Sequence, residues 1–315
     1  MPGWIEEIFY DLGAAWAIAR KDMKIYYLKP SILVSSLLFP FVMFLAFAIG
    51  RDTTPEILLP GLLAITLLFS ATSIGPVSIP IERRTKTFDR LLSAPISVRA
   101  IVLGASLSGA IFASAIGIVA TAVGLIVLRI GIIHIVAFLI GIGLTSICFS
   151  TMGTLFASYR TENVGEVMSL LNLVRLPLLF ISGVFIPIAN MPAWGLSIAR
   201  FSPLTYAHDL IRFAFDETTL FGPVTDVAVL VLTLIIFQVA GALLYQRSRE
   251  WLLLALRTGS FRADRPPALA RGAGAVVAIP GEGRVQGVSP YPGPWEVSPR
   301  EEGKMPPPLS LLGSI

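Results

Sequence analysis

Apolar residues in this sequence come in long runs, in contrast to the short alternating stretches of a soluble domain. A helix that crosses a bilayer needs about 20 mostly apolar residues. Six stretches reach this length, and we number them as spans one to six: Ser31–Gly50, Ile57–Ile81, Ala100–Leu128, Ile130–Ala157, Val164–Ile186 and Val224–Tyr245. The pattern predicts an all-α membrane protein with six transmembrane helices.

Two of the spans are irregular. Span two is interrupted near its end by Gly75-Pro76 and Pro80, and span five carries Asn172 and Arg175. An arginine that faces lipid in the middle of a span costs several kcal/mol. Arg175, with Asn172 one turn earlier, therefore either lines a translocation path or pairs with a neighbouring helix, unless the span begins later and leaves Arg175 near the interface.

Composition and charge support a membrane location. The 315 residues are 55% hydrophobic and 14% charged, whereas soluble domains carry roughly 25% charged residues. Lysine and arginine gather before span one, after span two and after span six, and such clusters mark the cytoplasmic side. We therefore expect a multi-pass protein of the cell membrane with both termini in the cytoplasm.

The regions that flank the spans divide the chain further. Residues 1–30 are predicted to form an amphipathic helix on the cytoplasmic membrane surface or, alternatively, a helix packed on another chain. Its apolar stripe consists of Trp4, Ile5, Ile8, Phe9, Leu12, Trp16 and Ala19. Residues 31–245 form the transmembrane domain, and residues 246–259 a cytoplasmic juxtamembrane segment. Residues 260–315 are rich in proline and glycine, which predicts a disordered tail.

Small residues follow one face of spans three and four. They are Ala105, Gly109, Ala113, Gly117 and Thr121 in span three, and Ser146, Ser150, Thr154 and Ser158 in span four. Small faces let helices approach closely in lipid. We interpret both faces as contacts within one bundle in preference to a dimer seam, because such faces are common in any bundle.

The loop from Glu82 to Arg99 combines basic residues with an apolar stripe. Phe88, Leu91 and Leu92 lie at helical spacing, so the loop is predicted to contain a short amphipathic helix that ends before Pro95. This helix either docks onto a partner or is a solvated loop whose charges fix the topology.

Two segments of the chain resemble the ABC-2 type permeases. The first, of the form E-R-x-x-x-T-x-x-x-L-L-x-x-P-[IV]-S, is matched by Glu82, Arg83, Thr87, Leu91, Leu92, Pro95, Ile96 and Ser97. The second, of the form S-G-x-x-[FI]-P-x-x-x-[ML]-P-x-W followed by P-L-T-Y, is matched by Ser182, Gly183, Ile186, Pro187, Met191, Pro192, Trp194, Pro203, Leu204, Thr205 and Tyr206. With the six-span layout, the resemblance covers residues 5–255.

The resemblance implies a six-span exporter subunit that pairs with itself or a related permease and is driven by a separate ABC ATPase. Its coupling helix, seated in a cleft of that ATPase, would involve Glu82, Arg83, Arg84, Thr87, Phe88, Arg90, Leu91 and Leu92. The segment Pro187–Phe215 would form a re-entrant helical pair on the outer side, with Pro187, Pro192, Trp194, Pro203 and Tyr206 as marker residues. Prolines prevent one continuous helix there, and broken backbone at membrane depth needs cover from protein or a water-filled cavity. An ordinary outer loop is the alternative.

Catalytic chemistry finds little support in the sequence. No G-x-x-x-x-G-K-[ST] phosphate loop is present, so ATP and Mg are expected on the partner subunit, with no cofactor on this chain. His134 and His208 are far apart, and no metal-ligand spacing occurs. We expect membrane lipid, and no nucleic acid, among the partners, and export of an amphipathic drug, a lipid-linked molecule or a polysaccharide. A secondary transporter and a membrane-embedded lipid-processing enzyme are the alternatives.

Overall fold

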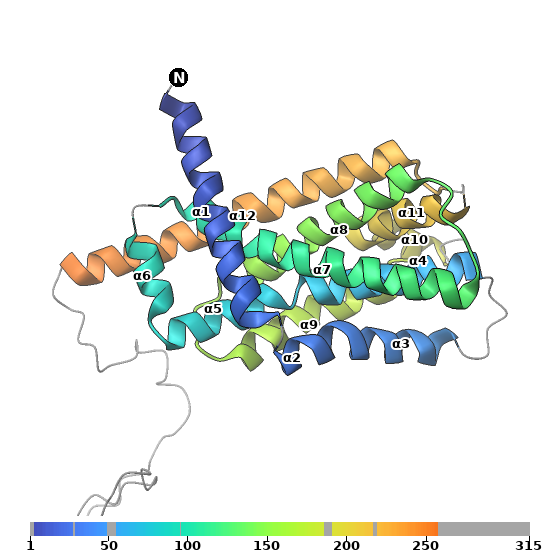
Figure 1. The fold of residues 1–315 in the computed structure, drawn as a ribbon, viewed down its shortest axis with the longest axis horizontal. Helices are drawn as coiled ribbons and strands as arrows, with labels where there is room; N and C mark the ends of the chain where they lie inside the picture. Colours follow the sequence, from blue (N-terminus) through green and yellow to red (C-terminus); the bar gives the residue numbers. More distant parts are fainter. Residues whose placement is uncertain are drawn as a thin grey trace, which may run out of the picture. The chain divides into compact units, whose positions relative to one another are not determined.

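The computed structural model describes residues 3–27, 29–48, 55–94, 96–185, 191–216 and 219–257, and every regular element among them is helical (Figure 1). The first half contains α1 (Gly3–Tyr26), α2 (Pro30–Leu33), the π-helix η1 (Val34–Leu38), α3 (Phe39–Ala48), α4 (Pro55–Ala71), α5 (Ile74–Arg84) and α6 (Thr87–Ser93). The second half contains α7 (Val98–Leu128), α8 (Ile135–Phe156), α9 (Val164–Ile181), α10 (Ala193–Ala199), α11 (Pro203–Asp216) and α12 (Pro223–Arg257). The predicted all-α class is confirmed.

Five helical stretches within the described residues are long and apolar enough to cross a membrane. They are Leu58–Arg84, Val98–Leu128, Ile135–Phe156, Val164–Ile181 and Pro223–Arg247. These stretches correspond to predicted spans two to six, so the chain is a multi-pass membrane protein. The predicted fourth span begins late, because the backbone N–H groups of Ile133 and His134 donate to the Ala214 carbonyl before α8 starts.

The segment predicted as span one is helical but divided. Its residues form α2, η1 and α3 in succession, and it is not among the five long stretches. Pro40 has no N–H to donate to the carbonyl of Ser36, four residues earlier, and a lost bond of this kind favours a local π turn. The Ser70 hydroxyl, on α4, donates to that Ser36 carbonyl at 3.0 Å instead. The count of six spans stays a prediction.

The centre of the bundle is built by α4, α7, α8 and α11, with α12 packed along α8. The small faces of α7 and α8 meet here: Ser150 donates to the Ser106 carbonyl at 2.6 Å, and Gly109 leaves no room for a Cβ atom against Ser150. Gly117 packs in the same way against Leu67 of α4. These faces are contacts within one chain, as interpreted from the sequence.

Helix α1 packs against α7 along one face. A Cβ atom on Gly104 of α7 would lie 2.7 Å from the Ala15 carbonyl oxygen, so this glycine allows the close crossing. Ala19, which was placed on the exposed apolar stripe, is buried in this contact, whereas Phe9, Leu12 and Trp16 are exposed. The helix therefore has two apolar faces, one buried by the bundle and one open.

Two short helical regions lie at opposite ends of the bundle: α6 at one end, and α10 with α11 at the other (Figure 1). Helix α12 passes without a break through the predicted juxtamembrane segment as far as Arg257. The whole of the predicted tail, residues 260–315, together with Pro187, lies outside the described residues.

Candidate functional site

Helix α6 is attached to the bundle by two buried side chains. Phe88 is 2% exposed and Leu92 is 5% exposed, and both pack among Ile101 and Val102 of α7 and Tyr245 of α12. The rings of Phe88 and Tyr245 lie 5.9 Å apart between centroids. Leu91 is partly buried beside them. The apolar stripe of this loop is therefore occupied by its own chain.

This packing changes the interpretation of the loop. The sequence favoured docking of the stripe onto a partner, but Phe88 and Leu92 have no free face to offer one. A side chain at a helix surface can either pack inward or bind outward, and the distinction depends on what tertiary structure lies beneath it. A partner that binds here would contact the exposed residues of the loop instead.

The exposed part of the loop is basic. Arg84, Lys86, Thr87 and Arg90 are all exposed on or beside α6. Lys86 adopts the left-handed conformation, with φ of 58°, and turns the chain between α5 and α6. Its ammonium group lies 3.7 Å from a carboxylate oxygen of Glu162, an exposed pair that contributes little to stability. These side chains form a rim around the two buried anchors, and we call Arg84, Lys86 and Arg90 the basic rim.

Arg83 lies under the rim and joins three parts of the chain. Its guanidinium group donates to the carbonyl of Tyr159 and, at 3.4 Å, to that of Ser158, both after α8. The same group lies 5.2 Å from the centroid of the Phe88 ring, a cation–π contact. Arg83 therefore positions the loop and is only partly exposed.

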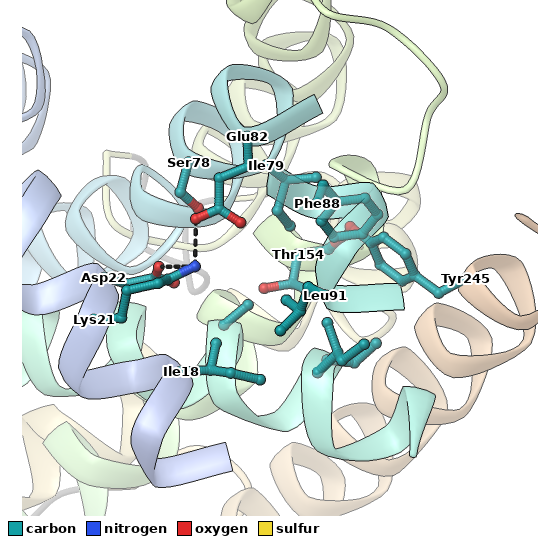
Figure 2. Close-up of a pocket in the computed structure, with 13 residues that line it drawn as sticks. Ile18, Lys21, Asp22, Ser78, Ile79, Glu82, Phe88, Leu91, Thr154 and Tyr245 are labelled. Carbon is teal, nitrogen blue, oxygen red and sulfur yellow. Dashed lines mark hydrogen bonds and ion pairs between the residues drawn. The ribbon is translucent and has the colours of Figure 1, made fainter. Parts of the chain in front are cut away.

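A charge cluster of two buried carboxylates and one partly exposed lysine lies next to these anchors (Figure 2). Lys21 of α1 pairs with Glu82 of α5 and lies 3.1 Å from a carboxylate oxygen of Asp22. Figure 2 shows Lys21 and Asp22 pointing from α1 toward Glu82, across a small pocket that Phe88 and Tyr245 also line. Through this cluster, α1 is tied directly to the segment that leads into α6.

The electrostatics of the cluster follow from one cation and two carboxylates. Burial raises the pKa of Asp22 to about 7; Lys21 opposes this shift and the negative charge of Glu82 adds to it. Burial by itself lowers the pKa of Lys21, but Asp22 and Glu82 together hold it above its ordinary value. The cluster can therefore take up a proton at Asp22 near neutral pH while Lys21 stays charged.

Sequence reasoning missed Asp22 and Tyr245. Asp22 lies at heptad spacing from Ala15, and both belong to the face of α1 that packs on the bundle. A carboxylate at such a position signals a buried partner, but the sequence does not show that Glu82 and Lys21 meet there. Tyr245 ends the last predicted span, and its hydroxyl donates to the Thr154 carbonyl at 3.1 Å.

Arg175 lies away from α6, at the break between α4 and α5. It is 3% exposed and donates to the Thr72 carbonyl at 3.3 Å, with its guanidinium carbon 4.5 Å from the centroid of the Phe69 ring. Pro76 lacks the N–H that would otherwise bond to Thr72, so Arg175 satisfies a carbonyl that the proline leaves open. Asn172 is half-buried on the same helix. These contacts match the predicted pairing with a neighbouring helix, and a role in a translocation path stays a prediction.

The segment predicted to be re-entrant contains α10 and α11, joined by a tight turn. Thr205 donates to the Ala199 carbonyl at 2.8 Å, and the Tyr206 hydroxyl donates to the Arg200 carbonyl at 2.7 Å. Trp194 and Pro192 are exposed at the start of α10, whereas Pro203 is buried at the start of α11. The structure therefore contains two helices in this segment, and its depth in a membrane stays a prediction.

Comparison with known proteins places the chain among transporters. The family model described as ABC-2 type transporter matches residues 13–215. The transport permease ycf38 of Cyanophora paradoxa is 25% identical over 250 residues, which cover 70% of this chain and 83% of that protein. The ycf38 permease of Porphyra purpurea is 25% identical over 166 residues, or 50% of this chain and 55% of that protein.

Proposed function

Because this chain belongs to the ABC-2 type transporter family, we propose that it is the membrane-embedded permease subunit of an ATP-driven exporter. In this proposal the chain pairs with a second permease copy or a related subunit, and ATP with Mg is bound by a separate ATPase. The cargo is an amphipathic drug, a lipid-linked molecule or a polysaccharide, carried outward across the cell membrane. Both termini lie in the cytoplasm, and α10 with α11 form the re-entrant pair on the outer side.

The observation that best supports this proposal is the construction of α6. Phe88 and Leu92 fix the helix to the bundle, and Arg83 binds the chain that leads into α6 to the segment after α8. The basic rim remains exposed. A lever that transmits force from a motor needs a rigid attachment on one side and a free contact surface on the other. The rim supplies that surface, and its charge favours an acidic cleft on the partner.

The attachment also offers a route for the motion. Glu82 ends the segment that enters the membrane, and Lys21 couples it to α1, which lies along α7. A displacement of α6 therefore pulls on α5 and α1 together. In this proposal the charge cluster transmits ATPase movement to the transmembrane helices.

The test is co-purification of the full chain with its ATPase, followed by ATPase and transport assays in reconstituted membranes. Replacing Arg84, Lys86 and Arg90 together by glutamate should abolish retention of the ATPase and export, while insertion of the permease stays normal. Retention by single-residue variants should weaken further as ionic strength rises, because exposed charge pairs are screened by salt.

A matched control reverses exposed basic residues outside this loop. Arg129 and Arg200 lie at other helix ends and are replaced by glutamate in the control variant. The control should retain the ATPase. If the rim variant and the control bind the ATPase equally well, α6 does not provide the contact and the coupling role is wrong.

A further inference from the structure

Two buried aspartates meet where α11 packs on the start of α12. Asp209 lies in the middle of α11 and is 1% exposed, and Asp226 lies in the first turn of α12 and is 0% exposed. Their carboxyl groups contact each other across the junction of these two helices. This arrangement places two acidic groups together in a site closed to water.

The two carboxyl groups have very different hydrogen-bond partners. Asp209 Oδ2 accepts from the backbone N–H groups of Leu220 at 2.8 Å and Phe221 at 3.1 Å, just before α12 begins. Neither carboxyl oxygen of Asp226 receives a bond from an N–H or O–H donor among the described residues. Hydrogen bonds from N–H groups stabilise a carboxylate, whereas a buried carboxylate without donors is strongly disfavoured. Asp209 is therefore the member of the pair suited to carry the negative charge.

One cation of α11 acts on this pair, and it acts on Asp209. Arg212 lies one turn from Asp209 and its positive charge favours the Asp209 carboxylate, although its ion pair is with Asp216 at 3.1 Å. Burial, together with Arg212, lowers the pKa of His208 to about 4, so its imidazole is neutral near neutral pH. Tyr206 donates to the Arg200 carbonyl, and helix α10 contains no ionisable side chain.

The other helices that pack on α11 add no counter-charge. Residues 58–71 of α4 and the whole of α8 contain no lysine, arginine, histidine, aspartate or glutamate. On α9, Arg175 is held by Thr72 and Phe69, and Glu166 accepts a hydrogen bond from Thr161. His134, which precedes α8, stacks on Phe213. Asp226 is the only charged residue of α12 before its cytoplasmic half.

Two buried carboxylates in contact cannot both be ionised without a large electrostatic cost. We propose that Asp209 and Asp226 form a proton-binding site, in which one shared proton holds α11 against the start of α12. Asp226 carries the proton and donates it to the Asp209 carboxylate, whose other bonds fix the turn at Leu220. When the proton leaves to solvent, two negative charges face each other and the α11–α12 junction loosens.

This proton site does not depend on the identity of the cargo or on the ATPase. It ties the helices that follow span five to the last span, so its protonation controls how firmly that end of the bundle is closed. The junction should therefore hold tightly at low pH and open more readily as the pH rises through the titration of the pair.

The direct test is infrared difference spectroscopy on the full-length protein in lipid nanodiscs, titrated with pH. The wild type should show the carbonyl stretch of a protonated carboxyl group at neutral pH, with the shift in deuterated water that such a group undergoes. Asp226→Asn should remove this band and Asp216→Asn, a matched change at a partly exposed position of α11, should retain it. Asp22→Asn identifies any contribution from the charge cluster near α6.

A second measurement is thermal unfolding of the same proteins as a function of pH. The wild type should unfold at a lower temperature as the pair loses its proton, and Asp226→Asn should remove this part of the pH dependence because its amide donates to Asp209 without a titrating proton. If Asp226→Asn does not fold, the spectrum of Asp22→Asn still decides, because the charge cluster near α6 then contributes no protonated carboxyl group. An Asp22→Asn protein without the band, or a band that survives both Asp226→Asn and Asp209→Asn in the Asp22→Asn background, overturns the proposal.

Discussion

Helices α6 and α11 are both short, and they handle burial and charge in opposite ways. In α6 only Phe88 and Leu92 are buried, whereas nearly every residue of α11 is buried between α4, α8 and α12. At the α6 end one lysine bridges two carboxylates, and at the α11 end two carboxylates meet while the nearby Arg212 forms its ion pair with Asp216. A helix with few anchors and an exposed rim is suited to contact a partner, whereas a helix inside the core is suited to keep one end of the bundle closed.

The strongest challenge to this comparison is removal of an α6 anchor. Phe88→Ala should lower the stability of the permease itself by about 3–5 kcal/mol, because a buried aromatic ring leaves a cavity. If the apolar stripe faced outward, Phe88→Asp would disturb only the contact with the partner. Because Phe88 is buried, this substitution should instead misfold the chain. Thermal unfolding of the permease without its ATPase measures both effects. Unchanged stability in either variant would show that Phe88 faces outward.

The charge cluster should make stability depend on pH. Asp22 keeps a proton up to about pH 7 in the folded chain, whereas its ordinary pKa is 3.8. Between these values the folded state holds a proton that the unfolded state has lost, so stability falls as pH rises through this window, by about 2–4 kcal/mol in total.

Comparison of Asp22→Asn with the wild type measures this effect. The variant should lose that part of the pH dependence, and Asp89→Asn on the partly exposed side of α6 should keep it. Equal pH profiles for Asp22→Asn and the wild type would mean that Asp22 is not protonated in the folded chain.

Arg175 lies between the α6 end and the α11 end of the bundle. Its substitution should lower the stability of the chain less than substitution of Phe88 or Asp22. Arg175→Met keeps the length of the side chain but leaves the Thr72 carbonyl open, which should cost about 1–3 kcal/mol. If the arginine only caps the helix break, specific transport activity per folded molecule should be near normal. Lost transport at unchanged thermal stability would instead support a role in the translocation path, and Asn172→Leu on the same helix provides the comparison variant.

The smallest effect on stability is expected at the basic rim. Replacing Arg84 or Arg90 by alanine should change stability by no more than about 0.5 kcal/mol, since neither side chain is buried. The same variants should still weaken retention of the ATPase in a salt-dependent manner. A large loss of thermal stability in these variants would mean that the rim supports the bundle, and the contrast with Phe88 would disappear.

Much of the architecture could be predicted because lipid imposes simple rules. Five of the six predicted spans correspond to long apolar helices, since backbone groups in lipid must bond within their own helix. The motif beginning at Glu82 and the small faces of spans three and four were also visible in sequence. The first span was harder to predict, because Pro40 divides its helix and the Ser36 carbonyl that the proline leaves open is bonded by Ser70, which another helix supplies.

Sequence by itself determined the all-helical class, the family and the residues that compose the α6 loop, because these depend on local periodicity and on motifs. Tertiary structure decided the direction in which each side chain faces. It turned Phe88 into an anchor, brought Lys21 to Glu82, placed Arg175 on the carbonyl opened by Pro76, and set Asp209 against Asp226. These pairings join residues from different helices, and helical periodicity fixes the face of each helix but not the helix that covers it.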